Sequence, residues 1–168
     1  MTIERKLATA FHLDEKGWSH HANPWSVWTR NSVLPLLALA VWSRAWIGWW
    51  AVLLCALGVV WGWVNPHIFP KPRSTKNWAS KAVLGERLWL NRDVVPVPEH
   101  HRLAPRILMV LSFSGIPFFV WGTIALDIWP TVFGLTLVSL GKLWFIDRMV
   151  WLYEEMKDTD PVYRSWLY

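Results

Sequence analysis

The sequence predicts an all-α membrane protein with four transmembrane helices arranged as two hairpins. Three observations support this class. The 168-residue chain is 54% hydrophobic and 17% charged, whereas aqueous domains average roughly 25% charged residues. Residues 45–64 contain no charge, and a helix of that length matches a hydrocarbon layer of roughly 30 Å. Sixteen tryptophans mostly gather near the ends of the apolar segments, as in the aromatic belts of membrane proteins.

We treat residues 1–168 as one integral membrane domain. Its four expected spans cover residues 26–43, 45–64, 106–122 and 130–146. The first span requires Arg30 to extend its side chain to the interface. A single helix over residues 31–64 would be roughly 51 Å long and would exceed the bilayer. We therefore expect one turn at Ser43-Arg44 and a second between Gly122 and Trp129.

Two further helices are expected outside the spans. Residues 65–105 form a polar loop that contains an amphipathic helix over residues 77–90. A C-terminal helix from Trp144 to Asp158 has one polar face that includes two tryptophans. The C-terminal helix is expected to lie at the membrane interface. The alternative is that its polar face packs over Glu86 and the histidines.

The distribution of basic residues predicts the orientation. Of 17 lysines and arginines, only Arg44 lies in an expected outer turn. The others lie in the N-terminal segment, in the central loop, or from Lys142 onward. The positive-inside rule then places both termini and residues 65–106 in the cytoplasm, with the protein in the cytoplasmic (inner) membrane. The net charge of +5 indicates a face beside anionic lipid, so the lipid bilayer is the expected partner and nucleic acid is not.

The histidines suggest a site at the cytoplasmic boundary. All six fall on the predicted cytoplasmic side, and adjacent pairs at His20-His21 and His100-His101 precede the two hairpins. One histidine from each pair together with His67 could bind a divalent metal, with His21, His67 and His101 as the candidate ligands. The alternative is a set of interfacial histidines bonded to backbone or lipid phosphate.

Glu86 is the fourth candidate metal ligand. On a helical projection it lies in an apolar stripe with Ala79, Ala82, Val83 and Leu90. A carboxylate in such a position must pair, protonate or bind something. A salt bridge to an arginine elsewhere in the chain, a metal ligand and a general base all remain open.

Four residues are expected to anchor the chain at the inner membrane boundary: Trp25, Trp28, Arg30 and Trp144. Within HHANPWSVWTR, Asn23-Pro24 should break the direction of the chain, because proline fixes its own φ and restricts the residue before it.

Two sequence blocks carry a resemblance. HANPWSVWTR at 21–30 and NPHIFP…LGERLWL within 65–90 fit the patterns H-x-N-P-W-S-x-W-T-R and N-P-x-x-F-P…L-G-E-R-x-W-L. The chain thereby resembles a family of small bacterial and archaeal multi-pass integral membrane proteins of unknown function. The resemblance covers most of the chain and implies a membrane location without an assigned activity.

The leading functional hypothesis is a binding or accessory role in the cytoplasmic membrane, in a larger complex or as a homo-oligomer. The alternative is a metal-dependent membrane enzyme that uses His21, His67, His101 and Glu86, with Asp147 or Glu154 as a further candidate. A small transporter ranks lowest, because no ionisable residue lies in the middle of an expected span. The sequence contains no phosphate-binding loop, dinucleotide glycine pattern or nucleophile elbow, so catalytic and cofactor-binding residues remain unassigned.

Overall fold

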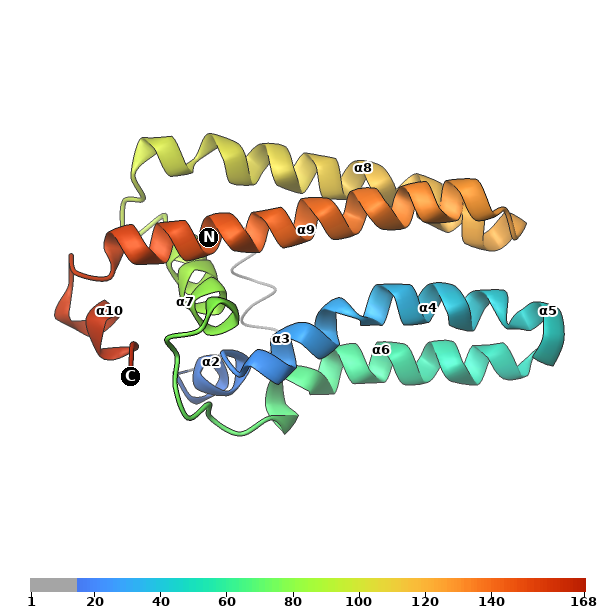
Figure 1. Ribbon diagram of the computed structural model, residues 1–168, viewed down its shortest axis with the longest axis horizontal. Coiled ribbons are helices and arrows are strands. Elements are labelled where there is room, and N and C mark those ends of the chain that lie inside the picture. Colours follow the sequence, from blue (N-terminus) through green and yellow to red (C-terminus); the bar gives the residue numbers. More distant parts are fainter. Residues whose placement is uncertain (1–14) are drawn as a thin grey trace.

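The computed structural model describes residues 15–168 and is helical throughout its regular structure (Figure 1). The elements in chain order are α2 (Glu15–His21), α3 (Pro24–Asn31), α4 (Val33–Trp42), α5 (Arg44–Ile47), α6 (Trp50–Ile68), α7 (Trp78–Leu90), the 3-10 helix η1 (Glu99–His101), α8 (Leu103–Ala125), α9 (Ile128–Met156) and α10 (Pro161–Ser165). His12 and the N-terminus lie outside the described residues.

Three helical segments are long and apolar enough to cross a membrane: α6, the segment Glu99–Ala125 that contains α8, and α9. The region expected as the first span is divided instead into α3 and α4 at Ser32. Pro35 explains the division. Its nitrogen cannot donate to the carbonyl of Asn31, and its ring crowds that carbonyl.

The two turns that join the long helices lie at the same end of the molecule (Figure 1). In the first, α5 precedes Gly48, whose φ of 57° suits glycine, so α6 begins at Trp50, five residues later than expected. In the second, the Asp127 side chain accepts a bond from the Trp129 backbone N–H. The guanidinium of Arg44 donates to the carbonyl of Ile124 and links the two turns.

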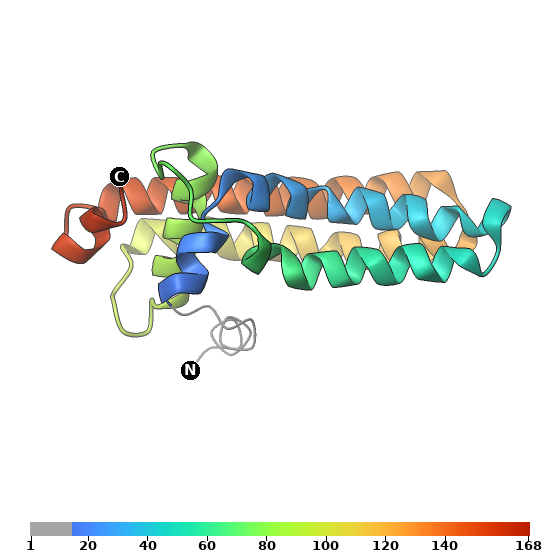
Figure 2. The same cartoon turned by 90° about the horizontal axis from the view of Figure 1, so that it is seen from below.

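Helices α8 and α9 lie side by side along their length (Figures 1 and 2). Glycines allow the close approach. A Cβ placed on Gly134 would lie 2.3 Å from the backbone nitrogen of Phe119 and 2.7 Å from the carbonyl oxygen of Gly115. Small residues that bring backbones together are a common basis of helix association in membranes.

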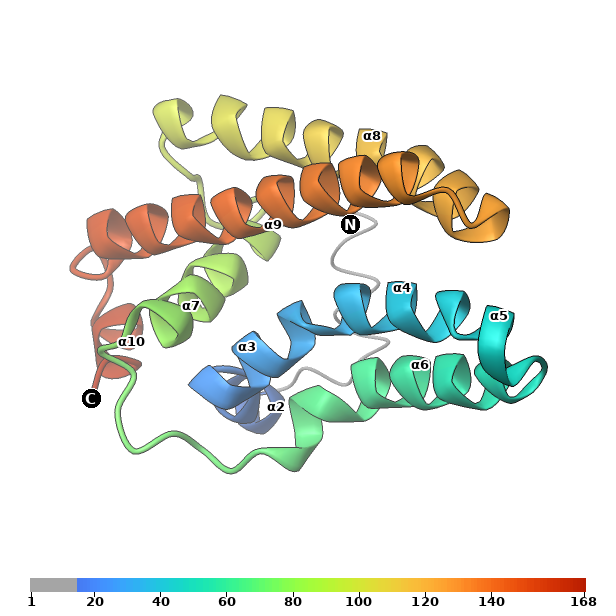
Figure 3. The same cartoon turned by 45° about the vertical axis from the view of Figure 1, so that its right-hand side comes forward.

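Helix α7 crosses α9 near the opposite end of the molecule (Figure 3). The expected amphipathic helix is thus confirmed, and Asn77 caps it by accepting a bond from the Ser80 N–H at 2.9 Å. A Cβ on Gly85 would lie 1.8 Å from the carbonyl oxygen of Met149. The largest buried cluster joins α7, the following loop and α9 through Leu84, Leu88, Trp89, Val97, Met149, Leu152, Tyr153 and Met156.

The expected C-terminal helix is the continuation of α9, which runs unbroken to Met156. Its apolar side packs on α7. On its polar side, Asp147 accepts a bond from the Trp78 indole N–H at 3.0 Å, and Glu155 contacts the His100-His101 pair. The prediction of a helix separate from the fourth span was wrong. The polar residues after 146 contact α7 and the loop before α8, and none of them interrupts α9.

Candidate functional site

The stretch that begins at His20 forms one wall of the candidate site. Helix α2 ends at His21 and α3 starts at Pro24, so the predicted change of direction at Asn23-Pro24 is confirmed. Asn23 fixes this corner. Its Oδ1 accepts from the Trp25 N–H at 2.9 Å, and its Nδ2 donates to the carbonyl of Pro70 at 2.8 Å.

His21 is buried at this corner. Trp18 contacts the ring edge-on, with centroids 5.8 Å apart. Nη1 of Arg30 lies 2.7 Å from Nε2 and 2.8 Å from Nδ1 of His21. Burial lowers the pKa of His21 well below its ordinary value of 6.5, and the positive charges of Arg30, His67 and Lys142 lower it further. The imidazole is therefore neutral and accepts a hydrogen bond from Arg30.

Arg30 and His21 line a cavity of about 420 Å³ among α2, α3, α6, α7, α8 and α9. This volume lies within the range of roughly 300–1,000 Å³ that is typical of small-molecule sites. Most of the lining is apolar and comes from side chains such as Trp18, Leu108, Met109, Phe113, Phe145 and Ile146. Phe113 is 67% exposed on α8, so the cavity reaches the outer surface of that helix.

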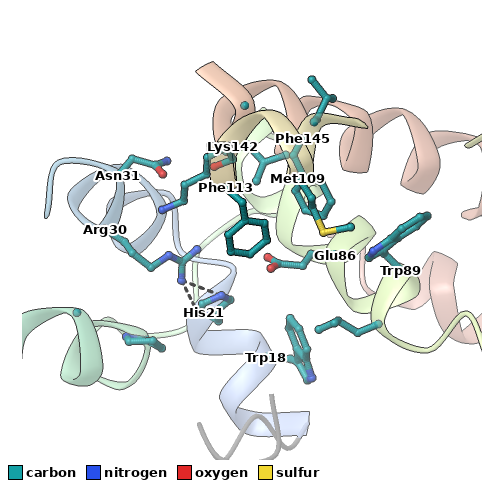
Figure 4. A pocket seen from close by; sticks show the side chains of 17 residues that line it. Trp18, His21, Arg30, Asn31, Glu86, Trp89, Met109, Phe113, Lys142 and Phe145 are labelled. Atoms are coloured by element: carbon teal, nitrogen blue, oxygen red, sulfur yellow. Dashed lines mark hydrogen bonds between the residues drawn. The ribbon is translucent and has the colours of Figure 1, made fainter. Parts of the chain in front are cut away.

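Charged side chains from three helices share the cavity: Arg30 from α3, Glu86 from α7 and Lys142 from α9. Figure 4 shows the Glu86 carboxylate within the cavity and the Arg30 and Lys142 side chains along the opposite wall. Two cations and one carboxylate leave an excess positive charge while His21 is neutral. Gly85 contributes to this geometry because the close crossing of α7 and α9 at Met149 brings the next residue, Glu86, to the cavity.

Two polar atoms of the lining have no hydrogen-bond partner in the described part of the chain. They are the indole Nε1 of Trp89 and Oδ1 of Asn31. Trp89 is only 1% exposed, and Figure 4 shows its nitrogen on the side of the ring nearer Glu86. Buried polar groups are normally paired, so this N–H is a donor available to a polar group within the cavity.

A comparison with known protein families identifies the relationship. The model of a family of unknown function (DUF6653) matches residues 2–165. The chain belongs to this family. The comparisons with curated proteins and with solved structures gave no match.

In this DUF6653 protein the four predicted metal ligands occupy two places. His21 and Glu86 both line the cavity. His67 is exposed on the last turn of α6, close enough for its charge to affect the pKa of His21. His101 instead lies beside His100 and Glu155. The structure thus brings His21 and Glu86 to one cavity and places His101 in a different cluster.

The predicted anchors also differ among themselves. Trp25, Trp28 and Trp144 are 70%, 52% and 51% exposed, and their contact with the headgroup region stays a prediction. Arg30 was predicted to extend to the interface, and it turns into the cavity instead.

Sequence reasoning missed Lys142 and Trp89 as site residues. Lys142 carried a signal, because it is the only charge between residues 130 and 146 of an apolar helix and such charges usually face a protein interior or cavity. Trp89 carried none, because it is one of sixteen tryptophans and only the packing of α7 distinguishes it.

Proposed function

We propose that this DUF6653 protein is a multi-pass protein of the cytoplasmic membrane that binds an anionic amphiphile at its cytoplasmic boundary. In this proposal α3 with α4, α6, α8 and α9 provide four spans in two hairpins. Both termini and residues 65–106 are cytoplasmic. The bias of lysine and arginine away from the outer turns supports the orientation.

The unpaired indole N–H of Trp89, in an apolar cavity that also holds two cationic side chains on its opposite wall, carries the proposal of an anionic ligand. A carboxylate or phosphate accepts bonds from an indole N–H, a guanidinium and an ammonium together, and hydrogen bonds to charged groups are the stronger ones. The aromatic and aliphatic lining suits a hydrocarbon chain. Phe113 provides the side through which such a chain enters from lipid, since α8 is exposed there.

The same charges weigh against the metal hypothesis for this cavity. A divalent cation bound by His21 and Glu86 would lie near both Arg30 and Lys142, which repel it at short range. The matching family has no assigned function, so membership does not favour either hypothesis. The binding role therefore takes precedence over a metal-dependent enzyme that uses these two residues.

Oleate and oleyl alcohol form a matched pair of probes, because they have the same chain and differ in the charge of the head. We expect calorimetry on the full chain in mild detergent to detect binding of oleate and much weaker binding of the alcohol. Lys142→Gln and Arg30→Gln should each weaken oleate binding about tenfold or more, because each removes a charge-assisted hydrogen bond. Phosphatidylglycerol as a third probe distinguishes a free carboxylate from a phospholipid headgroup.

Lys81→Gln is the matched control, since Lys81 lies on α7 but pairs with Glu154 at 2.5 Å outside the cavity. Equal binding of oleate and oleyl alcohol would contradict an anion site, as would equal loss in the control variant. The topology has a separate test in the Cys55→Ala background. A cysteine at Ser74 should resist an impermeant maleimide in intact cells, and a cysteine at Trp46 should react; the reverse pattern would contradict the orientation.

A further inference from the structure

A second cluster of ligand-type side chains lies where η1 meets the cytoplasmic end of α9 in the proposed topology. Nε2 of His100 and Nε2 of His101 each lie 2.9 Å from the same oxygen of Glu155, Oε2. One ligand atom from each of the three residues lies within 4.8 Å of the other two. The cluster shares no residue with the cavity lining.

Backbone packing holds the three side chains in place. The His101 N–H donates to the carbonyl of Pro98 and the Arg102 N–H to that of Glu99, each at 3.0 Å, which closes the short turn. Just before it, Val97 is 2% exposed and belongs to the buried cluster with Leu152 and Met156. These two residues flank Glu155 on α9, so the turn and the carboxylate are fixed to the same core.

We propose that His100, His101 and Glu155 bind one divalent transition-metal ion, with zinc as the reference case. Imidazole nitrogen and carboxylate oxygen are common zinc ligands at roughly 2.0–2.2 Å, which requires ligand atoms roughly 3.4 Å apart in a tetrahedral site. The two nitrogen–oxygen distances of 2.9 Å therefore need only a small expansion. Both imidazoles already point at one oxygen, so the ligand set is assembled before the ion arrives.

Three protein ligands leave a fourth tetrahedral position for water or an anionic ligand. Access is open, because the side chains of His100 and Glu155 are 65% and 46% exposed, whereas that of His101 is 11% exposed. Without metal, each Nε2–H donates a hydrogen bond to Oε2 of Glu155. Metal coordination at Nε2 places the imidazole hydrogen on Nδ1, so both rings are neutral in the zinc-bound state. The bound ion ties η1, and with it the start of α8, to the end of α9.

The test uses the full chain in mild detergent, with Cys55→Ala to remove the only thiol, after dialysis against a chelator. Titration with zinc should give about one ion per chain, as expected for a single three-ligand site. His101→Asn and Glu155→Gln should each weaken zinc binding about 100-fold or more by removing a ligand. X-ray absorption of the loaded protein should fit nitrogen and oxygen neighbours.

His67→Asn is the matched control, because His67 is an exposed histidine that is not part of the cluster. It should bind zinc like the parent. Absence of zinc binding, or binding that depends on His67 or His21 and survives Glu155→Gln, would overturn the proposal. Thermal melting of each variant without metal verifies folding, and a His100→Asn variant provides a second measurement if His101→Asn is unstable. Oleate binding by these variants should be unchanged, so this test and that of the cavity can fail separately.

Discussion

Helices α8 and α9 approach each other through their backbones, whereas α4 and α6 meet through side chains. In the first pair a Cβ on Gly141 would lie 2.7 Å from the backbone nitrogen of Ser112 and 2.8 Å from the carbonyl oxygen of Leu108. In the second pair a Cβ on Gly58 would meet only the side chain of Leu37, and one on Gly62 would meet nothing within 4 Å. Glycines thus contribute unequally to helix packing. Those whose Cα faces the backbone of a partner helix are required for the close approach, and the others are not.

Polar contacts provide the second difference. At the cytoplasmic end of the proposed topology, α3 is joined to α6 through Asn65, which is fully buried. Its Oδ1 accepts from the hydroxyl of Ser26 at 2.8 Å, and its Nδ2 donates to Thr29 Oγ1 at 2.7 Å. These bonds fasten the pair just where Pro66 interrupts the hydrogen-bonding pattern of α6. The first half is therefore held by polar side chains at its base and the second by close backbone packing along its length.

The largest expected effect is on the α8–α9 contact. Gly134→Ala should lower the free energy of unfolding by about 3 kcal/mol, at the upper end for overpacking, because backbone atoms cannot move aside as side chains do. Unfolding by dodecyl sulfate in mixed detergent micelles measures this change in the free energy of unfolding. Gly62→Ala is the control and should leave stability unchanged or slightly raised, since alanine favours the helix. Equal effects at both positions would contradict the comparison.

Asn65→Ala should have the next largest effect. It leaves the buried Ser26 hydroxyl without its acceptor, a loss of about 1–3 kcal/mol. The same unfolding measurement applies. Ser114→Ala is the control, because that exposed hydroxyl donates only to the carbonyl of Leu111 in its own helix. If Asn65→Ala and Ser114→Ala lose the same amount, the polar fastening of α3 to α6 has no special role.

A dependence on pH should follow from His21. Its pKa is well below 6.5 in the folded protein because of burial and then the charge of Arg30. The unfolded chain takes up a proton near pH 6.5 and the folded chain does not, so stability is full above this pH and falls as the pH drops below it. Between pH 7 and pH 5.5 the loss due to this group should be about 1 kcal/mol. His21→Gln should remove this loss, so the free energy of unfolding should fall by about 1 kcal/mol less between pH 7 and pH 5.5 than in the parent. An unchanged pH dependence would contradict a neutral His21.

The smallest effects are expected at the tryptophans of the entry stretch. Trp28 stacks on Trp78 with centroids 5.6 Å apart, so Trp28→Ala should lower stability in detergent by about 1 kcal/mol. Trp25 is 70% exposed, and Trp25→Ala should change stability less. The difference in melting temperature between the two variants measures this. A larger loss in Trp25→Ala would indicate that anchoring in the micelle outweighs the stacking contact.

The sequence by itself determined the helical class, the amphipathic helix that became α7 and the corner at Asn23-Pro24. These features follow from composition, periodicity and local stereochemistry, which act over a few residues. Glu86 could be predicted to face inward because its apolar neighbours on the helix must be buried.

Only the tertiary structure decided what meets Glu86 and His101. Arg30 could reach either the interface or the interior, and the position of α3 against α7 and α9 selected the cavity. His101 lies with Glu155 because Val97 and α9 share a core, a contact between residues more than fifty positions apart. The backbone approach at Gly85 and Met149 likewise depends on how two helices cross. Such contacts depend on how distant helices pack, and local sequence patterns do not encode that packing.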